Sequence, residues 1–457
     1  MNSKTGFKVP NSFIIVFMLM VLVAALTYII PAGKYEFVKG TKIIDPNTFH
    51  FVASRSTTLW GFINSVFGGM KRSGPIILFT FLVGGYFYVL IETKAFDRLI
   101  GFLVKKLGGR ELVIIPLMMI VMSILGAVGI MANPVVAVVP VGLILAKSLH
   151  LDQICALALT YCAAYTGYSM SPMCAMTVQT AQKIADVPLM SGFAFRTFGW
   201  LVLLAITILY VMRYAAKILK NPEASVMGDE FVIEDQKVEI DDNFGIRDFL
   251  VLAGLAVGLA VYTYGSFAFK WGLDHMAATF LLIAVWGALV SGMGAEGFVK
   301  NLVAGAQKMA FSALLIGLAT SISVILTEGN ILHSLIYYVA AGMSKLPEVL
   351  IGPVMFYANI IFNFFVSSGS GQAAVVMPIM APLSDVVGIS RQMAICAFQY
   401  GDGLSNSIFP TNGVMIASVA VAGVRFDKWL KWMVPLFGIW TLVATILVII
   451  GCAIGVN

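Results

Sequence analysis

The chain contains one acidic side chain in a long stretch that otherwise carries no charge. Asp402 lies between Gly401 and Gly403, inside the apolar segment Gln392–Ala422. An ionisable group within a membrane segment is costly and usually marks a site for a substrate, a cation or a proton. We therefore expect Asp402 to be ionised and to hold either a substrate amine or a coupling cation. Capping of a broken helix is its alternative role.

This acid belongs to a repeated unit. Adding 238 to a residue number in the first half repeatedly gives the same residue type in the second half: Pro140 and Pro378, Ser169 and Ser407, Pro172 and Pro410. In each copy a hydrophobic helix is interrupted by small polar residues and a proline, TGYSMSP at 166–172 and LSNSIFP at 404–410. Such breaks leave unpaired N–H groups, which suit carboxylates, and unpaired C=O groups, which suit Na⁺. The position equivalent to Asp402 holds Ala164, so only the second break carries an acid.

Each copy also opens with a long uncharged stretch, at 112–146 and at 349–384. Such a stretch is too short for two membrane spans with a turn and too long for one, because a span needs roughly 20 residues. A re-entrant hairpin fits best, and irregular backbone at that depth must be buried or line a polar cavity. The two tips read GIMANP at 129–134 and SSGSGQ at 367–372, with glycines that permit tight turns and polar groups that offer ligands.

The candidate site residues gather at these tips and breaks. Close packing of small residues is the alternative explanation for any single serine or glycine, but matched clusters in both repeats favour a site. The candidate substrate-binding residues are Asn133, Tyr165, Tyr168, Ser169, Asn363, Ser370, Gln372, Asp402, Asn406, Ser407, Thr411 and Asn412. The candidate ion-binding residues are Gly129, Asn133, Thr166, Gly167, Ser367, Ser368, Gly369 and Ser405.

Composition indicates an all-α, polytopic membrane protein. The chain is 60% hydrophobic and 11% charged, with a mean hydropathy of +0.93. In such a protein the net charge of +6 reflects topology and does not indicate nucleic-acid binding. The five cysteines lie in apolar segments without metal-type spacing, and the chain has no phosphate-binding loop, zinc-protease motif or nucleophile elbow. We therefore expect no enzyme activity and no cofactor beyond a coupling Na⁺ or H⁺.

The distribution of lysine and arginine predicts the layout. Residues 1–220 form the first repeat, with a hairpin at 112–146 and a broken helix at 152–184; residues 221–245 form a cytoplasmic linker; residues 246–457 form the second repeat, with a hairpin at 349–384 and a broken helix at 392–422. An additional span at 276–291, whose counterpart in the first half is only an interfacial helix at 56–70, inverts the second repeat. The result is about nine spans and two hairpins, with the N-terminus inside and the C-terminus outside.

Three motifs carry a family resemblance: YIIPAGKYEF at 28–37, SSGSGQAAVVMPIMAPLSD at 367–385 and YGDGLSNSIFPTNG at 400–413. The whole chain resembles the YfcC-like branch of the C4-dicarboxylate anaerobic carrier (DcuC) family, within the ion-transporter superfamily. The resemblance implies a scaffold domain for homodimerisation, a mobile transport domain that bears both hairpins, and elevator-type alternating access. It also implies that tips and breaks hold substrate and Na⁺. Sodium symporters of that superfamily have Ser-Asn-Thr at both tips, whereas this chain has Ala132-Asn133-Pro134 and Ser368-Gly369-Ser370.

Together these patterns predict a secondary active transporter of the inner (cytoplasmic) membrane, driven by Na⁺, H⁺ or exchange. A dicarboxylate site would need arginine or lysine at the breaks, and neither break contains one. An acid beside hydroxyls and half-helix N-termini better suits an amino acid, cationic ones included, or a short peptide. A C4-dicarboxylate remains the alternative substrate, and a membrane-embedded enzyme or a channel is a remote one.

Overall fold

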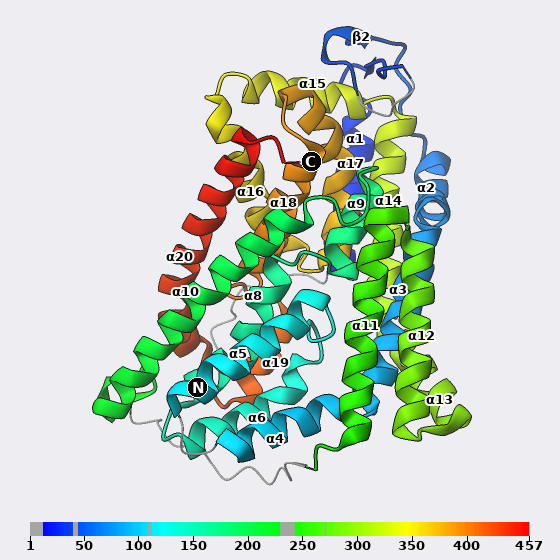
Figure 1. Ribbon diagram of the computed structural model, residues 1–457. Coiled ribbons are helices and arrows are strands. Elements are labelled where there is room, and N and C mark those ends of the chain that lie inside the picture. The colour runs from blue at the N-terminus through cyan, green and yellow to red at the C-terminus, as the bar shows by residue number, and fades with distance from the viewer. Residues whose placement is uncertain (1–11, 40–43, 108–110, 229–242, 270, 457) are drawn as a thin grey trace, which may run out of the picture.

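The computed structural model describes residues 12–39, 44–107, 111–228, 243–269 and 271–456. The described residues are mainly helical, and their one sheet is a short antiparallel pair, β1 (Gly33–Lys34) and β2 (His50–Phe51). This pair belongs to a loop between the first two helices, residues 27–58, which lies at one end of the molecule (Figure 1).

The first half of the chain contains helices that follow the predicted order. They are α1 (Ser12–Leu26), α2 (Leu59–Arg72), α3 (Gly74–Glu92), α4 (Ala95–Leu107), α5 (Glu111–Val128), α6 (Val135–Ser148), α7 (Gln153–Leu157), α8 (Ala163–Ser169), α9 (Thr180–Ile184) and α10 (Phe193–Lys220). Short π-helical turns, η2 (Ala158–Cys162) and η3 (Ala175–Gln179), join α7 to α8 and lead into α9. Two 3₁₀ turns, η1 (Pro46–Thr48) and η4 (Pro222–Ala224), lie outside the helices.

The second half repeats this order after two further helices. Its elements are α11 (Ile246–Phe269), α12 (Leu273–Ser291), α13 (Gly294–Lys308), α14 (Ala310–Glu328), α15 (Leu332–Met343), α16 (Glu348–Phe365), α17 (Gly369–Val387), α18 (Arg391–Ser405), α19 (Gly413–Val421) and α20 (Phe426–Ala453).

Length and apolar composition identify six helices of the described residues that could cross a bilayer: α3, α10, α11, α12, α17 and α20. Counting the bent pair α13–α14 as one span makes seven. The sequence predicted nine spans, among them α1 and the two broken helices, which are shorter or interrupted in the structure. The sequence also placed α17 in a re-entrant hairpin. It is long enough to span, but two thirds of its most apolar window is buried inside the protein.

The structure corrects one correspondence between the halves. Helix α13 was not predicted, because its charged sequence GAEGFVKNLVAGAQK lacks a membrane-spanning apolar run. Subtracting 238 from its bounds gives 56–70, so α13 is the counterpart of α2, and α12 is the element without one. These equivalent helices pack against the opposite half of the chain: α2 packs along α14, and α13 packs along α3. The sequence analysis was therefore wrong to pair the interfacial helix at 56–70 with the span at 276–291.

Turns separate helix pairs at both predicted hairpin tips, and both of the helices predicted to be broken are interrupted. Helices α5 and α6 flank a turn at 129–134, helices α16 and α17 flank 366–368, and the two units lie toward opposite ends of the molecule (Figure 1). The helices of the other two units break at 170–174 and at 406–412. Each break contains a proline, Pro172 or Pro410, which cannot donate a backbone hydrogen bond and so interrupts the helix. The inverted orientation and the domain boundaries themselves stay predictions.

Candidate functional site

The two broken helices meet at their breaks. Gly403, near the end of α18, faces Ser169, the last residue of α8, so closely that a Cβ atom on Gly403 would overlap Ser169 Cα. The sequence analysis did not foresee this contact, which places residues from both repeats in one region. Gly401 and Gly403 lie within the regular helix α18, and they permit close helix approach, Gly401 against Asn359 and Gly403 against Ser169.

Asp402 is completely buried at this meeting point. Its Oδ2 accepts a long hydrogen bond of 3.5 Å from the Tyr168 hydroxyl of the first repeat. Its Oδ1 has no hydrogen-bond partner among the described residues, and neither oxygen has an ion-pair partner there. A buried carboxylate in this state is costly unless a cation, a proton or further donors complete its environment. Asp402 is therefore the least satisfied group of the site.

The tip of the second hairpin lies directly over Asp402. A Cβ atom on Gly369 would lie 3.1 Å from Asp402 Oδ2 and would overlap the side chains of Tyr168 and Thr177. The tip is also tied to the second break, because Ser367 Oγ donates to the Thr411 carbonyl at 2.8 Å. Helix α17 begins at Gly369, so the first residue of this helix lies beside the carboxylate. The structure thus brings three of the four units together: both broken helices and the second hairpin.

A network of amides supports the second break from below the tip. Asn363 Nδ2 donates to the Asp402 carbonyl at 3.1 Å, to Ser405 Oγ at 2.8 Å and to Asn406 Oδ1 at 2.9 Å. Asn412 Nδ2 donates to the same Asn406 oxygen at 2.8 Å and caps α19 with its own Oδ1. These four side chains, all predicted site residues, hold the non-helical segment in one shape.

The first hairpin packs against the first broken helix rather than against Asp402. The Tyr165 hydroxyl donates to the Ala132 carbonyl at 3.3 Å, and Gly129, with φ +93°, packs against Cys174. The Asn133 side chain is exposed and lies away from Asp402 within the described residues. The structure therefore does not bring Asn133 to Asp402, although the sequence predicted it for both the substrate and the ion.

Other predicted residues point elsewhere or bond locally. Thr166 Oγ1 lies 2.9 Å from Ser123 Oγ of α5, and Gly167 packs against the same turn of α5. Ser169 Oγ donates to the Tyr165 carbonyl within its own helix at 2.6 Å. Gln372, also buried, donates to the Asn359 carbonyl and side-chain oxygen, both at 3.1 Å. Ser370 is buried beside the tip, and Ser368 is half-buried at its start.

Several buried oxygen atoms around the second break have no hydrogen-bond partner among the described residues. They are Asp402 Oδ1, Ser407 Oγ, Thr411 Oγ1, Thr177 Oγ1, Asn363 Oδ1 and Gln372 Oε1. Buried oxygens are nearly always satisfied, so a group of unsatisfied ones indicates a place for a ligand, an ion or water. Carboxylate, hydroxyl and amide oxygens are the donors that hard cations prefer. Groups of three or more His, Cys, Asp or Glu that could hold a transition metal are absent from the described residues.

Sequence reasoning missed several residues of this region. Gln399 Nε2 donates to the Tyr168 carbonyl at 2.6 Å, the Tyr161 hydroxyl donates to the Asn406 carbonyl at 3.1 Å, and Trp429 Nε1 donates to the Ser407 carbonyl at 2.9 Å. Each satisfies a backbone carbonyl that a break leaves open. Helical periodicity could have identified Gln399, because it lies three residues before Asp402 and therefore on the same face of the helix.

A buried arginine also reaches the first break. Arg196, with no exposed surface, donates from Nη2 to the Ser191 carbonyl at 2.6 Å and to the Pro172 carbonyl at 3.3 Å. The sequence analysis found no arginine or lysine within either break, and it did not foresee that α10 would bring one there. Arg196 faces the side of α18 that bears Gln392 and Tyr400. Asp402 lies about 200° around the helix from Tyr400, so Arg196 does not neutralise it.

Comparison with known proteins identifies the family of this chain. The family model described as the C4-dicarboxylate anaerobic carrier, DcuC, matches residues 9–453. The chain belongs to this family. It is 30% identical to an Escherichia coli (strain K12) protein named "Putative basic amino acid antiporter YfcC", over 96% of each chain. It is also 25% identical to an uncharacterised protein of Haemophilus influenzae, over 98% of each.

Two solved structures share the fold. The Alcanivorax borkumensis YdaH transporter superposes with a TM-score of 0.74 at 15% identity, covering 98% of this chain and 99% of its own. Neisseria gonorrhoeae MtrF, described as illuminating a class of antimetabolite efflux pumps, superposes with a TM-score of 0.69 at 15% identity, covering 98% and 96%. The protein is therefore a multi-pass membrane transporter of the DcuC family, and its named relatives are carriers rather than enzymes. The family resemblance drawn from the sequence is confirmed.

Proposed function

We propose that this protein is a secondary active transporter of amino acids with a positively charged side chain, working by exchange or with a coupling Na⁺ or H⁺. The observation that carries the proposal is Asp402, a completely buried carboxylate with one unpaired oxygen and no cationic partner among the described residues. A substrate ammonium or guanidinium supplies the missing positive charge and the missing donors.

The surroundings of Asp402 suit the rest of such a substrate. The first turn of α17 begins beside the carboxylate, at Gly369, and its free N–H groups can receive a substrate carboxylate group. The unpaired hydroxyls of Ser407 and Thr411 line the same break. An acid and a helix N-terminus side by side form a pair of opposite charges, which matches a zwitterion better than a dianion. The name of the 30%-identical relative, a basic amino acid antiporter, supports the same class.

A cation site next to the substrate fits the remaining oxygens. The unsatisfied Asn363 Oδ1 and Gln372 Oε1, with the backbone carbonyls at the second break, offer neutral ligands of the kind that Na⁺ takes in secondary transporters. We propose that movement of the hairpins and broken helices against a fixed scaffold gives elevator-type alternating access, and that the scaffold forms a homodimer in the inner membrane.

A C4-dicarboxylate is the second candidate, because the family description names that substrate and because Arg196 is buried near the first break. Arg196 donates two hydrogen bonds from Nη2 to backbone carbonyls, and its Nε and Nη1 have no partner among the described residues. It lies on the far side of α18 from Asp402. With Asp402 as the charged group at the meeting point, a dianion would face repulsion that a zwitterion does not.

The proposal is tested by a binding screen of the purified protein in lipid nanodiscs. Lysine, arginine, alanine, a lysine-containing dipeptide and succinate are titrated with and without Na⁺ while thermal stability is followed. A ligand at a hundredfold excess over its Kd raises the apparent stability by about 2.7 kcal/mol. The proposal expects lysine or arginine to give the largest shift. Absence of any shift with lysine and arginine would overturn it, and loss of succinate stabilisation in a variant of Asp402 would favour the dicarboxylate alternative.

A further inference from the structure

A second polar cavity lies far from Asp402, at the end of the molecule that carries β1 and β2. Its volume is about 520 Å³, and its polar wall is formed by Arg72, Lys183, Asp186, His333 and Arg391. Arg391 is the first residue of α18 and Asp402 is the twelfth, so a rise of 1.5 Å per residue separates their backbones by about 16 Å. The two sites are therefore distinct.

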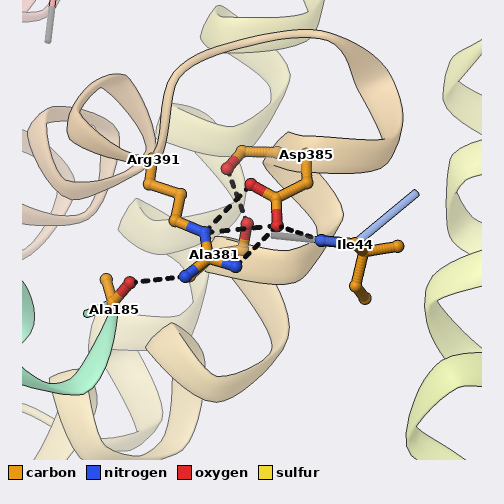
Figure 2. Close-up of polar contacts among 6 residues, drawn as sticks. Ile44, Ala185, Ala381, Asp385 and Arg391 are labelled. Atoms are coloured by element: carbon orange, nitrogen blue, oxygen red, sulfur yellow. Dashed lines mark hydrogen bonds and ion pairs between the residues drawn. The ribbon is translucent and has the colours of Figure 1, made fainter. Parts of the chain in front are cut away.

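One wall of this cavity is rigid. Arg391 forms a two-pronged ion pair with Asp385, with Nη2 to Oδ2 at 2.6 Å and Nε to Oδ1 at 2.9 Å, and its Nη1 donates to the Ala185 carbonyl at 2.8 Å (Figure 2). Asp385 Oδ2 also accepts the backbone N–H of Ile44 at 3.2 Å. These contacts join α17, α18, the end of the first broken helix and the loop 27–58. They fix the guanidinium and offset its charge.

Two further cations in the cavity wall are differently placed. Arg72 ends α2, Lys183 lies in α9, and both side chains are exposed. Neither forms an ion pair among the described residues, whereas Arg391 is paired with Asp385. They come from separate units, α2 beside α14 and α9 beside α17. Asp186 is the one carboxylate in the lining, against these two cations and the paired Arg391.

His333 adds a neutral donor to the same wall. Its Nδ1 accepts the backbone N–H of Tyr35 at 2.9 Å, so in the neutral ring the proton is on Nε2. Burial, with the nearby Lys34, lowers the pKa of His333 and keeps the ring neutral at physiological pH. A cavity of this size falls within the range of small-molecule sites, and arginine and lysine are the usual partners of carboxylate and phosphate groups.

We infer that this cavity is a separate binding site for a small organic anion, with Arg72 and Lys183 as its charge partners and the Asp385-braced Arg391 as its fixed wall. The ligand bridges α2 to the broken helix of the first repeat, and it therefore holds these two units in the arrangement seen here. This site goes beyond the proposed transport function and does not depend on Asp402.

Calorimetric titration of the full-length protein in nanodiscs tests this site. Acetate, succinate and inorganic phosphate serve as probes, and putrescine serves as the cationic control. The titrations use both the wild type and Asp402→Asn, so that binding at the transport site is recognised. The matched variants are Arg72→Gln with Lys183→Gln, and Lys71→Gln as a control on the neighbouring exposed residue of α2.

We expect succinate or phosphate to bind both backgrounds with a Kd of about 1 mM or lower, and the double variant to bind about tenfold more weakly. Lys71→Gln retains the wild-type affinity, and putrescine does not compete. Binding of succinate without phosphate supports an organic anion as the ligand of this site. Equal binding of both also supports the site and shows that it accepts any small dianion. Equal affinity in the wild type and the double variant, or no binding of the three anions, overturns the inference.

Discussion

The two halves of this transporter carry the same elements, yet their breaks are in different chemical states. In the first break the hydroxyls bond locally, as Ser169 does to the Tyr165 carbonyl, and Arg196 closes the Pro172 carbonyl. In the second break Asp402 and Ser407 have buried oxygens without partners among the described residues. The two hairpin tips also differ: Gly369 of the second tip lies beside Asp402, whereas Asn133 of the first tip is exposed. The comparison suggests that one repeat supplies the ligand-binding groups and the other supplies their frame.

The largest expected effect is a difference between the two hairpin tips in labelling by a reagent that cannot cross the membrane. The predicted layout has the first hairpin enter the membrane from the cytoplasmic side and the second hairpin enter from the outer side. An impermeant maleimide should therefore label a cysteine at Asn133 in inside-out vesicles but not in intact cells, and a cysteine at Ser368 in intact cells. A cysteine at Glu223, exposed at the start of the linker, is the cytoplasmic control. Its neighbour Ser225 is a poor reporter, because it is buried and donates to Asp152. Labelling of both tips from one side would remove the inverted arrangement.

The second tip should tolerate no side chain at Gly369. Gly369→Ala introduces a methyl group against Tyr168 and Thr177, and overpacking of this kind costs about 1–3 kcal/mol, or roughly 5- to 150-fold in affinity. Gly413→Ala is the matched control, since a Cβ atom there meets nothing within 4 Å. Substrate counterflow in proteoliposomes measures both. Normal transport by Gly369→Ala would show that the tip does not close on the site.

The equivalent serines provide the sharpest internal comparison. Ser407→Ala removes an unpaired buried hydroxyl that is available to a ligand, and we expect it to weaken substrate or Na⁺ binding about tenfold, or 1.4 kcal/mol. Ser169→Ala removes a hydroxyl that already bonds its own helix, and should change affinity by about twofold at most. Calorimetric titration of both variants decides this. Equal losses would mean that the repeats contribute equally.

Substitution of Tyr168 should weaken substrate binding more than substitution of Tyr165, by a smaller margin than the one expected between the two serines. The Tyr168 hydroxyl contacts Asp402 at 3.5 Å, whereas that of Tyr165 contacts the first tip. Because the first bond is long, Tyr168→Phe should cost about 0.5–1.5 kcal/mol of amine-substrate binding, and Tyr165→Phe less. The same titrations compare the two. A larger loss in Tyr165→Phe would move the site toward the first hairpin.

Local signals in the sequence predicted the helical units well. Prolines at the breaks and glycines at the tips act within a few residues, and the offset of 238 relates the two copies, so these turns and helix breaks could be expected from the sequence alone. Helix α13 was missed because it is charged and amphipathic, and such a pattern does not distinguish a packed helix from a surface one.

Contacts between distant segments could not be predicted in this way. Arg196 is far from Pro172 along the chain, and only the packing of α10 brings the two together. Gly401 and Gly403 were expected to loosen the backbone, but they lie in a regular helix and make room for Asn359 and Ser169. Asp402 is recognisable in the sequence as the one acid of its segment, because charge within an apolar run is visible without a structure; its role as a site residue stays a prediction.

The central claim is that Asp402 supplies the charge that recognises a substrate amine. Calorimetric titration of lysine and arginine into the wild type, Asp402→Asn and the exposed control Asp427→Asn tests it most directly. The account predicts that Asp402→Asn weakens amine binding more than tenfold, or about 1.4 kcal/mol, while Asp427→Asn does not and succinate affinity is unchanged or improved. Unaltered amine affinity together with unaltered ion dependence in Asp402→Asn would contradict the account and leave Asp402 with only the alternative role of capping the broken helix.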